Sequence, residues 1–259
     1  MGRDIIRQWV VALSVVAVVV FNILANALPL NGQNTGEISD RFKVLFVPAG
    51  YVFAIWGVIY IGLIAYGIYQ FLPSQRNNPR LASIAWLFVV SSAANIVWLF
   101  LWHYNVFFLT VVAMGALLIS LIAIYLRLGI GRVNVPAVET WLVRVPFSIY
   151  LGWITVATIA NVTDVLWLTG WNGQPLTPEV WTVLLLVIGA AIAAAVTFTR
   201  GDIVYPWVIV WAFIGIGVKQ AAVPVVATAA YVMAAVVALV TIAAAIYFVR
   251  SQDVFKPAG

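Results

Sequence analysis

The residues best suited to chemistry in this sequence are aromatic rings and side-chain amides that recur at helical spacing. In three apolar stretches they follow one another at three, seven or eleven positions, so that they share one face of a helix. Flat aromatic surfaces with a few amides suit a flat, apolar ligand with polar edges. The candidate ligand-binding residues are Phe53, Trp56 and Tyr60 in the first stretch, Asn95, Trp98 and Trp102 in the second, and Tyr150, Trp153, Ala157 and Asn161 in the third.

These residues also have a structural explanation, because Trp and Tyr concentrate where a membrane helix meets the interface. It fits the tryptophans near the ends of apolar stretches, namely Trp9, Trp102, Trp141, Trp167, Trp171 and Trp181. Trp56, Trp98 and Trp153 lie deeper, where a pocket wall and plain helix packing are both open. Asn95 and Asn161 need hydrogen-bond partners in hydrocarbon. A ligand would supply them, and so would a neighbouring helix, at about 0.6–2 kcal/mol each.

Residues for acid–base, nucleophilic or metal chemistry are scarce. The chain has no Cys, which excludes disulfides and thiolate chemistry, and its sole histidine, His103, lies in a short hinge. The apolar stretches hold no Asp or Glu, which argues against proton relays and intramembrane hydrolases. Lys219 could hold retinal as a Schiff base, but the stretches offer no carboxylate counter-ion. Its place near the end of a stretch favours an ammonium that extends to the interface. We expect no catalytic or metal-ligating residues, and a binding protein rather than an enzyme.

The composition predicts a membrane setting for these residues. Of the 259 residues, 65% are hydrophobic and 8% are charged. A soluble domain carries about 25% charged residues, so this chain cannot cover a globular surface with them. Soluble enzymes, disordered proteins and nucleic-acid binders are therefore excluded. The excess of 13 Lys and Arg over 8 Asp and Glu suits the cytoplasmic loops of a membrane protein.

Eight stretches are long and apolar enough to cross a bilayer, which takes about 20 residues. We expect an all-α integral membrane protein with spans at Trp9–Leu30, Phe46–Leu72, Leu81–Trp102, Val106–Leu126, Val145–Val162, Val180–Thr199, Ile203–Val218 and Val223–Val249. The first span is too long, and lacks a clear cleavage site, for a signal peptide. A capping residue precedes a proline at two predicted helix starts, Asn78–Pro79 and Thr177–Pro178.

The basic residues predict the orientation. With eight spans, ten of the 13 Lys and Arg fall on one side of the membrane, and Arg41, Lys43 and Lys219 fall on the other. Because basic residues concentrate in cytoplasmic loops, both termini are expected in the cytoplasm. A seven-span alternative weakens this bias. We expect the chain to lie among the lipids of a bacterial inner (plasma) membrane, with no nucleic-acid partner.

Three of the patterns resemble motifs of the tryptophan-rich sensory protein/translocator protein family (TspO/MBR). They are similar to the second-helix proline followed by Trp-x-x-x-Tyr, the third-helix Asn-x-x-Trp, and the fifth-helix Tyr-Leu-x-Trp with a later Asn. The matching residues stand in the family's order: Pro48, Trp56 and Tyr60; Asn95-Ile-Val-Trp98; Tyr150-Leu-Gly-Trp153 and Asn161. Ile149 stands where the family has a proline and Ser91 where it has a glutamine, which affects the polar contacts of the pocket.

The resemblance covers roughly residues 9–164 and implies a five-helix TspO-like bundle, here followed by about three additional transmembrane helices. We therefore expect a TspO-like domain of residues 1–164 and a C-terminal extension of residues 165–259. The family fold implies a pocket that opens toward the loop between the first two helices, here Asn31–Leu45. It also implies a homodimer, provided that the added spans leave the dimer face of the short members free.

The function that the resemblance implies is a membrane receptor or carrier for a flat apolar molecule, a porphyrin or related tetrapyrrole, with a sensing or transport role. No cofactor is required, and a porphyrin or haem-type tetrapyrrole would be the bound ligand. Two alternatives stay open. One is a light-dependent enzyme that degrades the tetrapyrrole, and the other is a secondary transporter of a small apolar solute.

Overall fold

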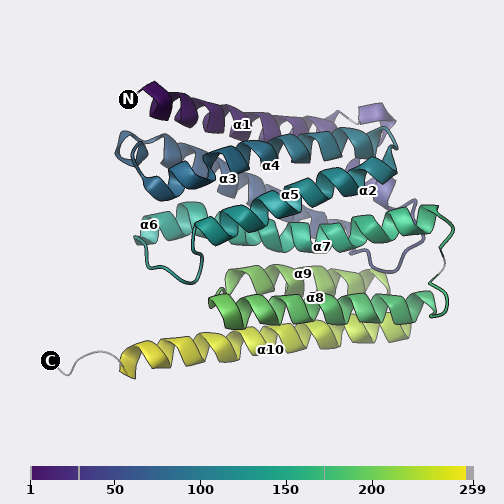
Figure 1. Ribbon diagram of the computed structural model, residues 1–259. Coiled ribbons are helices and arrows are strands. Elements are labelled where there is room, and N and C mark those ends of the chain that lie inside the picture. The colour runs from purple at the N-terminus through teal and green to yellow at the C-terminus, as the bar shows by residue number, and fades with distance from the viewer. Residues whose placement is uncertain (1, 29, 172, 255–259) are drawn as a thin grey trace.

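The structure is a computed structural model that describes residues 2–28, 30–171 and 173–254, and it forms an elongated bundle of helices (Figure 1). The long helices are α1 (Gly2–Ala27), α3 (Ile55–Phe71), α4 (Pro79–His103), α5 (Phe107–Arg127), α7 (Val145–Leu168), α8 (Pro178–Arg200), α9 (Val204–Lys219) and α10 (Pro224–Val254). Short helical segments connect them: η1 (Leu30–Gly32), α2 (Thr35–Ser39), η2 (Gly50–Ala54), η3 (Pro73–Gln75), α6 (Ala137–Glu139) and η4 (Thr140–Arg144).

The long helices have the length and composition of membrane spans. Within the described ranges, seven are long and apolar enough to cross a bilayer. The remaining long helix, α9, is apolar but has 16 residues. At a rise of 1.5 Å per residue, it is about 24 Å long. The predicted all-α membrane fold with eight apolar helices is confirmed, and the seventh predicted span is the shortest of the long helices.

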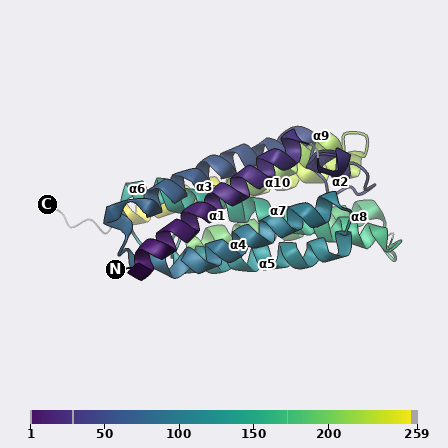
Figure 2. The ribbon, with the colours of Figure 1, turned by 90° about the horizontal axis from the view of Figure 1, so that it is seen from above.

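Helix α7 joins two groups of helices (Figures 1 and 2). On one side it packs against α3 and α5, which lie with α1 and α4. On the other side it packs against α8 and α9, and α10 lies along both of these. Helix α7 approaches α9 closely at Gly152, where an added Cβ would lie 3.0 Å from the backbone oxygen of Tyr205. A glycine suits this position because a Cβ would be tightly packed against the backbone of Tyr205 and the side chain of Val208.

A buried carboxylate holds the two groups together at one end. Asp202 is buried and lies two residues before Val204, where α9 begins. It accepts hydrogen bonds from the hydroxyls of Tyr125 on α5, at 2.9 Å, and of Ser148 on α7, at 2.6 Å. It also accepts one from the backbone N–H of Val204, at 2.8 Å, in the first turn of α9. One side chain therefore links three helices.

Consecutive long helices run in opposite directions, so that the start of α1 and the end of α10 lie at the same end of the bundle (Figure 1). We call this the basic end, because Arg7, Arg76, Arg80, Arg127 and Arg144 belong to helices and turns there. The opposite end carries Arg41, Lys43 and Lys219. Of the ten basic residues assigned to one side, Lys256 lies outside the described residues. That the basic end faces the cytoplasm stays a prediction.

The two predicted caps are confirmed. The side chain of Asn78 accepts a hydrogen bond from the backbone N–H of Arg80, at 3.0 Å, before Pro79 opens α4. Thr177 accepts one from the backbone N–H of Val180, at 3.4 Å, before Pro178 opens α8. These bonds satisfy amide groups that the first turn of a helix leaves without partners.

Several helix boundaries differ from those expected: α1, for example, begins at Gly2 instead of Trp9, and two other differences affect the site. The second long helix begins at Ile55 instead of Phe46, because the chain at Ala49 is extended and η2 intervenes. The fifth runs on to Leu168 instead of ending at Val162. It therefore contains Asp164, and the expectation that the spans hold no carboxylate is wrong. An acidic residue is typical of the end of a span, whereas the Asp164 side chain is buried within the helix.

Candidate functional site

Two adjoining hollows lie among α1, α3, α4 and α7, beneath the chain between α1 and α3. The inner cavity has a volume of about 60 Å³ and the outer cavity about 380 Å³. Both are lined by Thr35, Phe53, Trp56 and Trp98, so that they share a wall. The inner cavity lies against α7, and the outer cavity reaches the polar residues of α2.

Eight of the ten predicted ligand-binding residues line these hollows. Seven line the inner cavity: Phe53, Trp56, Trp98, Trp102, Trp153, Ala157 and Asn161. Tyr60 lines the outer cavity, together with three of the seven. Asn95 and Tyr150 line neither hollow and are buried beneath them. The three aromatic faces expected from helical spacing thus converge on one place, and their role in ligand binding stays a prediction.

The aromatic rings of the cavities contact one another across helices. Trp56 stacks on Tyr60 with ring centroids 5.6 Å apart, and Trp98 stacks on Trp102 at 5.3 Å. Trp153 places an edge against Trp56 at 6.2 Å and against Phe53 at 5.7 Å. Such edge-to-face and stacked pairs stabilise one arrangement of the rings by about 0.5–1.5 kcal/mol each. The walls are therefore held in place before any ligand enters.

The two predicted amides bridge neighbouring helices. Asn95, 1% exposed, accepts a hydrogen bond from the side-chain amide of Asn22 at 2.7 Å and donates one to the Tyr150 hydroxyl at 3.0 Å. Asn161 accepts one from the indole N–H of Trp98 at 3.2 Å and donates one to the Thr110 hydroxyl at 2.8 Å. The sequence leaves two kinds of partner open for these amides, a ligand and a neighbouring helix. In the structure, each amide has hydrogen-bond partners on neighbouring helices. Asn161 also keeps its place on the cavity wall.

Two buried polar atoms of the inner cavity have no hydrogen-bond partner among the described residues. They are the indole nitrogen Nε1 of Trp153 and the carboxylate oxygen Oδ1 of Asp164. The Asp164 side chain is 3% exposed. Sequence reasoning missed Asp164, although it lies three positions after Asn161 and so continues the face of Trp153, Ala157 and Asn161. The cavity therefore offers one donor and one acceptor to a ligand.

The chain that covers the cavities, residues 31–54, is here called the lid segment. It contains the predicted loop Asn31–Leu45 and includes α2 and η2. On the α4 side, the indole N–H of Trp102 donates to the backbone oxygen of Thr35 at 3.2 Å. Asn31 donates to the backbone oxygen of His103 at 3.0 Å. These two hydrogen bonds hold the first half of the lid segment over the cavities.

The second half of the lid segment is held by α9. The backbone N–H of Ala49 donates to the backbone oxygen of Gly215 at 3.0 Å. The indole N–H of Trp211 donates to the backbone oxygen of Val52 at 3.1 Å. Lys219 and Asp40 form an ion pair at 2.7 Å on the surface. Lys219 thus lies at the end of its helix, as expected, and its partner there is a carboxylate of the lid segment.

Two larger hollows lie elsewhere. The α7–α8 cavity, of about 740 Å³, is lined by Trp167, Trp171 and Trp181 and by Lys43 at the end opposite the basic end. The α1–α3 groove, of about 670 Å³, runs between α1 and α3. Neither contains a predicted site residue. Within the described ranges, no group of three His, Cys, Asp or Glu side chains is arranged to hold a metal ion.

Comparison with known proteins identifies the family. Residues 8–243 match the model of the TSPO-like protein family. The match runs through α8 and α9 into α10, beyond residue 164, where the resembling motifs end. No curated protein and no solved structure matches the chain. The family and the apolar helices indicate an integral membrane protein of a ligand-binding or transport type. Since the match covers most of the chain, this protein belongs to the TSPO-like protein family.

Proposed function

We propose that this protein is a membrane receptor or carrier that binds a porphyrin or related tetrapyrrole in the inner and outer cavities. The observation that carries the proposal is the pair of atoms without partners among the described residues, Trp153 Nε1 and Asp164 Oδ1, on one aromatic wall. An unsatisfied buried polar group costs about 1–3 kcal/mol, so a ligand that pairs with both gains affinity. A tetrapyrrole has pyrrole N–H donors for a carboxylate and acceptor groups for an indole N–H.

The size of the inner cavity requires movement on binding. A volume of about 60 Å³ holds a few water molecules and no drug-sized ligand. The adjoining outer cavity is lined in part by the lid segment, through Asn34, Gly36 and Asp40. Displacement of the lid segment would therefore join and enlarge the two hollows. In this proposal the lid segment opens to admit the ligand and closes over it.

The ten candidate residues divide into two roles under this proposal. Those on the cavity walls contact the ligand, with Trp56, Trp98 and Trp153 stacking against its faces. Asn95 and Tyr150 act beneath the walls, because their hydrogen bond ties α4 to α7. The proposal also assigns ligand binding to residues 1–164, treats residues 165–259 as an extension and places the chain in a bacterial inner membrane.

The test is a titration of the purified full-length protein with protoporphyrin, with tryptophan fluorescence as the readout. We expect saturable quenching in the wild type. Trp153→Phe keeps a ring and removes the N–H, and one lost hydrogen bond of about 1.4 kcal/mol weakens binding about tenfold. Asn161→Ala also weakens it. Trp86→Phe is the matched control, since Trp86 is 61% exposed and lies outside the cavities. Quenching that does not saturate, or equal affinities in all four proteins, contradicts the proposal.

A coupled secondary transporter is the second candidate, and Asp164 is the observation that favours it. The expected absence of carboxylates from the spans argued against proton or sodium coupling, and that argument no longer holds. Buried ionisable residues in membrane helices often belong to ion or proton pathways. Porphyrin flux into liposomes that follows a pH gradient in the wild type, and loses this dependence in Asp164→Asn, supports coupled transport. Porphyrin flux that depends equally on the pH gradient in both proteins contradicts coupled transport through Asp164.

A further inference from the structure

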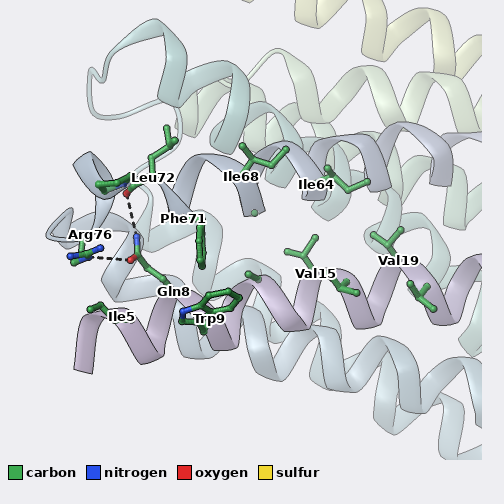
Figure 3. Close-up of a pocket in the computed structure, with 15 residues that line it drawn as sticks. Ile5, Gln8, Trp9, Val15, Val19, Ile64, Ile68, Phe71, Leu72 and Arg76 are labelled. Atoms are coloured by element: carbon green, nitrogen blue, oxygen red, sulfur yellow. Dashed lines mark hydrogen bonds between the residues drawn. The ribbon is translucent and has the colours of Figure 1, made fainter. Parts of the chain in front are cut away.

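The α1–α3 groove is apolar along its length and polar at one end (Figure 3). Its floor and walls are side chains of α1 and α3, among them Val15, Ile64 and Ile68. At the basic end, Trp9 lies edge-on against Phe71 with ring centroids 4.8 Å apart. Its volume of about 670 Å³ lies within the range of small-molecule sites, about 300–1,000 Å³.

The polar end of the groove holds a cation without an acidic partner. Gln8 is fixed by hydrogen bonds from its side-chain amide to the backbone oxygens of Gln70, at 2.7 Å, and Leu72, at 3.3 Å. Its side-chain oxygen accepts a hydrogen bond from Arg76 Nε at 3.4 Å (Figure 3). Among the described residues, no carboxylate forms an ion pair with Arg76. The guanidinium is thus positioned at the mouth of the groove with its charge unbalanced.

A second arginine beside the groove is already neutralised. Arg7 forms an ion pair with Asp4 at 2.8 Å and donates a hydrogen bond to the backbone oxygen of Arg76. It therefore supports the turn that carries Arg76 and adds no net charge when taken with Asp4. The positive charge that an incoming group meets at the groove mouth is that of Arg76.

The groove is longer than the hydrocarbon of one leaflet of a bilayer, so it can hold an acyl chain of that leaflet. Its lining on α1 extends from Ile5 to Val20, which is about 22 Å of helix at 1.5 Å per residue. The hydrocarbon of one leaflet is about 15 Å thick, half of the whole core. The basic end is the one expected in the cytoplasm, where anionic lipids concentrate. Trp9 lies near the same end, where indole rings favour the headgroup level.

We propose that the α1–α3 groove binds an anionic phospholipid, with one acyl chain between α1 and α3 and the phosphate group at Arg76. An apolar groove that faces the membrane is filled by hydrocarbon. Arg76, the one charged residue of the described groove lining, then selects the headgroup. This inference does not depend on the tetrapyrrole proposal, because the groove shares no lining residue with the inner cavity.

The test uses the full-length protein reconstituted in vesicles of equal parts phosphatidylglycerol and phosphatidylcholine. After mild extraction, native mass spectrometry counts the lipids that stay bound. We expect the wild type to retain phosphatidylglycerol in preference to phosphatidylcholine. One arginine near an anionic headgroup contributes about a fivefold preference, which Arg76→Gln should remove. Arg132→Gln is the matched control, since Arg132 is exposed in the α5–α6 connection and does not line the groove.

A second variant tests the binding of the acyl chain separately from the binding of the headgroup. Val16 is 58% exposed at the groove, so Val16→Trp fills it without replacing a core residue. We expect this variant to retain less of both lipids, whereas Arg76→Gln alters the ratio between them. Equal retention of the two lipids by the wild type would overturn the proposal. So would an equal loss in Arg76→Gln and Arg132→Gln, or a dimer of the wild type that Val16→Trp dissociates.

Discussion

The helices before residue 169 and those after it use their polar side chains in different ways. In the first group, buried amides reach across to other helices, as in the hydrogen bonds of Asn95 to Asn22 and Tyr150, whereas buried hydroxyls such as that of Ser91 donate within their own helix. In the second group, buried threonines donate to a backbone oxygen of their own helix, as Thr197 does to Ala193 and Thr241 to Val237. There, buried alanines such as Ala230 allow close packing.

This difference indicates which group of helices binds the ligand and which group supports the lid segment. Helices α1 to α7 hold aromatic and amide side chains in fixed positions around a cavity. Helices α8 to α10 pack through small side chains and contact the first group at a few defined points. Two of those points are the Asp202 joint and the contact of α9 with the lid segment. We infer that the second group braces the lid segment and the first group binds the ligand.

The largest effect is expected from removing the joint between the two groups. Asp202→Ala leaves the buried hydroxyls of Tyr125 and Ser148 without their acceptor and removes the acceptor of an amide in the first turn of α9. The summed loss in the free energy of unfolding is about 3 kcal/mol. Chemical denaturation in detergent measures it. Asp202→Asn is the control, because it keeps an acceptor oxygen and should lose less. An Asp202→Ala protein as stable as the wild type would show that the two groups do not depend on this joint.

The next effect concerns the contact between α9 and the lid segment. A Cβ at Gly215 would lie 2.1 Å from Val52 Cγ2 and 3.2 Å from Pro48 Cβ. Gly215→Ala should therefore lower the free energy of unfolding by about 1–3 kcal/mol, the range for overpacking, and displace the lid segment. Gly115→Ala is the matched control, since nothing lies within 4 Å of a Cβ there. If the two variants unfold at the same denaturant concentration, α9 does not brace the lid segment.

A smaller effect is expected from the amides of the first group. Asn95→Leu removes the bonds to Asn22 and Tyr150, for a loss of about 1 kcal/mol in the free energy of unfolding. Thr241→Val removes a bond that stays within α10, so its loss should be close to zero. Comparing the two unfolding curves measures how far polar links between helices distinguish the groups. Equal losses in the free energy of unfolding would contradict the difference between the two groups.

The smallest effect is expected from the ion pair between Lys219 and Asp40. Exposed pairs contribute about 0–1 kcal/mol, and this one lies on the surface. Lys219→Met should leave the unfolding curve nearly unchanged but speed the association of protoporphyrin, because the lid segment opens more readily. A double-mutant cycle with Asp40→Asn isolates the pair, and stopped-flow fluorescence gives the rate. High salt screens the ion pair, so it should raise the association rate of the wild type and leave that of Lys219→Met unchanged. An unchanged association rate would show that the ion pair does not limit the opening of the lid segment.

The membrane helices and the three aromatic faces could be predicted from the sequence because they depend on local properties. Apolar length specifies the spans, and spacing places Trp56 beside Tyr60 and Trp98 beside Trp102. The caps at Asn78 and Thr177 depend on neighbours within three residues. Each of these features requires little knowledge of the tertiary structure.

The rest could not be predicted because it depends on distant partners. Asp164 looks like the end of a span until its burial against the inner cavity is known. The bracing of the lid segment joins Ala49 to Gly215, and Asp40 to Lys219, across most of the chain. No local pattern marks such pairs. Likewise, Asn95 could serve a ligand or a helix, and its position relative to Asn22 and Tyr150 gives it helix partners.

An experimental structure with bound protoporphyrin tests the central claim most directly. Our account predicts ligand density beneath the displaced lid segment, against Trp98 and Trp153, with a ligand nitrogen within hydrogen-bond distance of Asp164. The α7–α8 cavity, at about 740 Å³, is the alternative place for a molecule of this size. Density beside Trp167 and Trp171, with the inner cavity unchanged, would contradict the account.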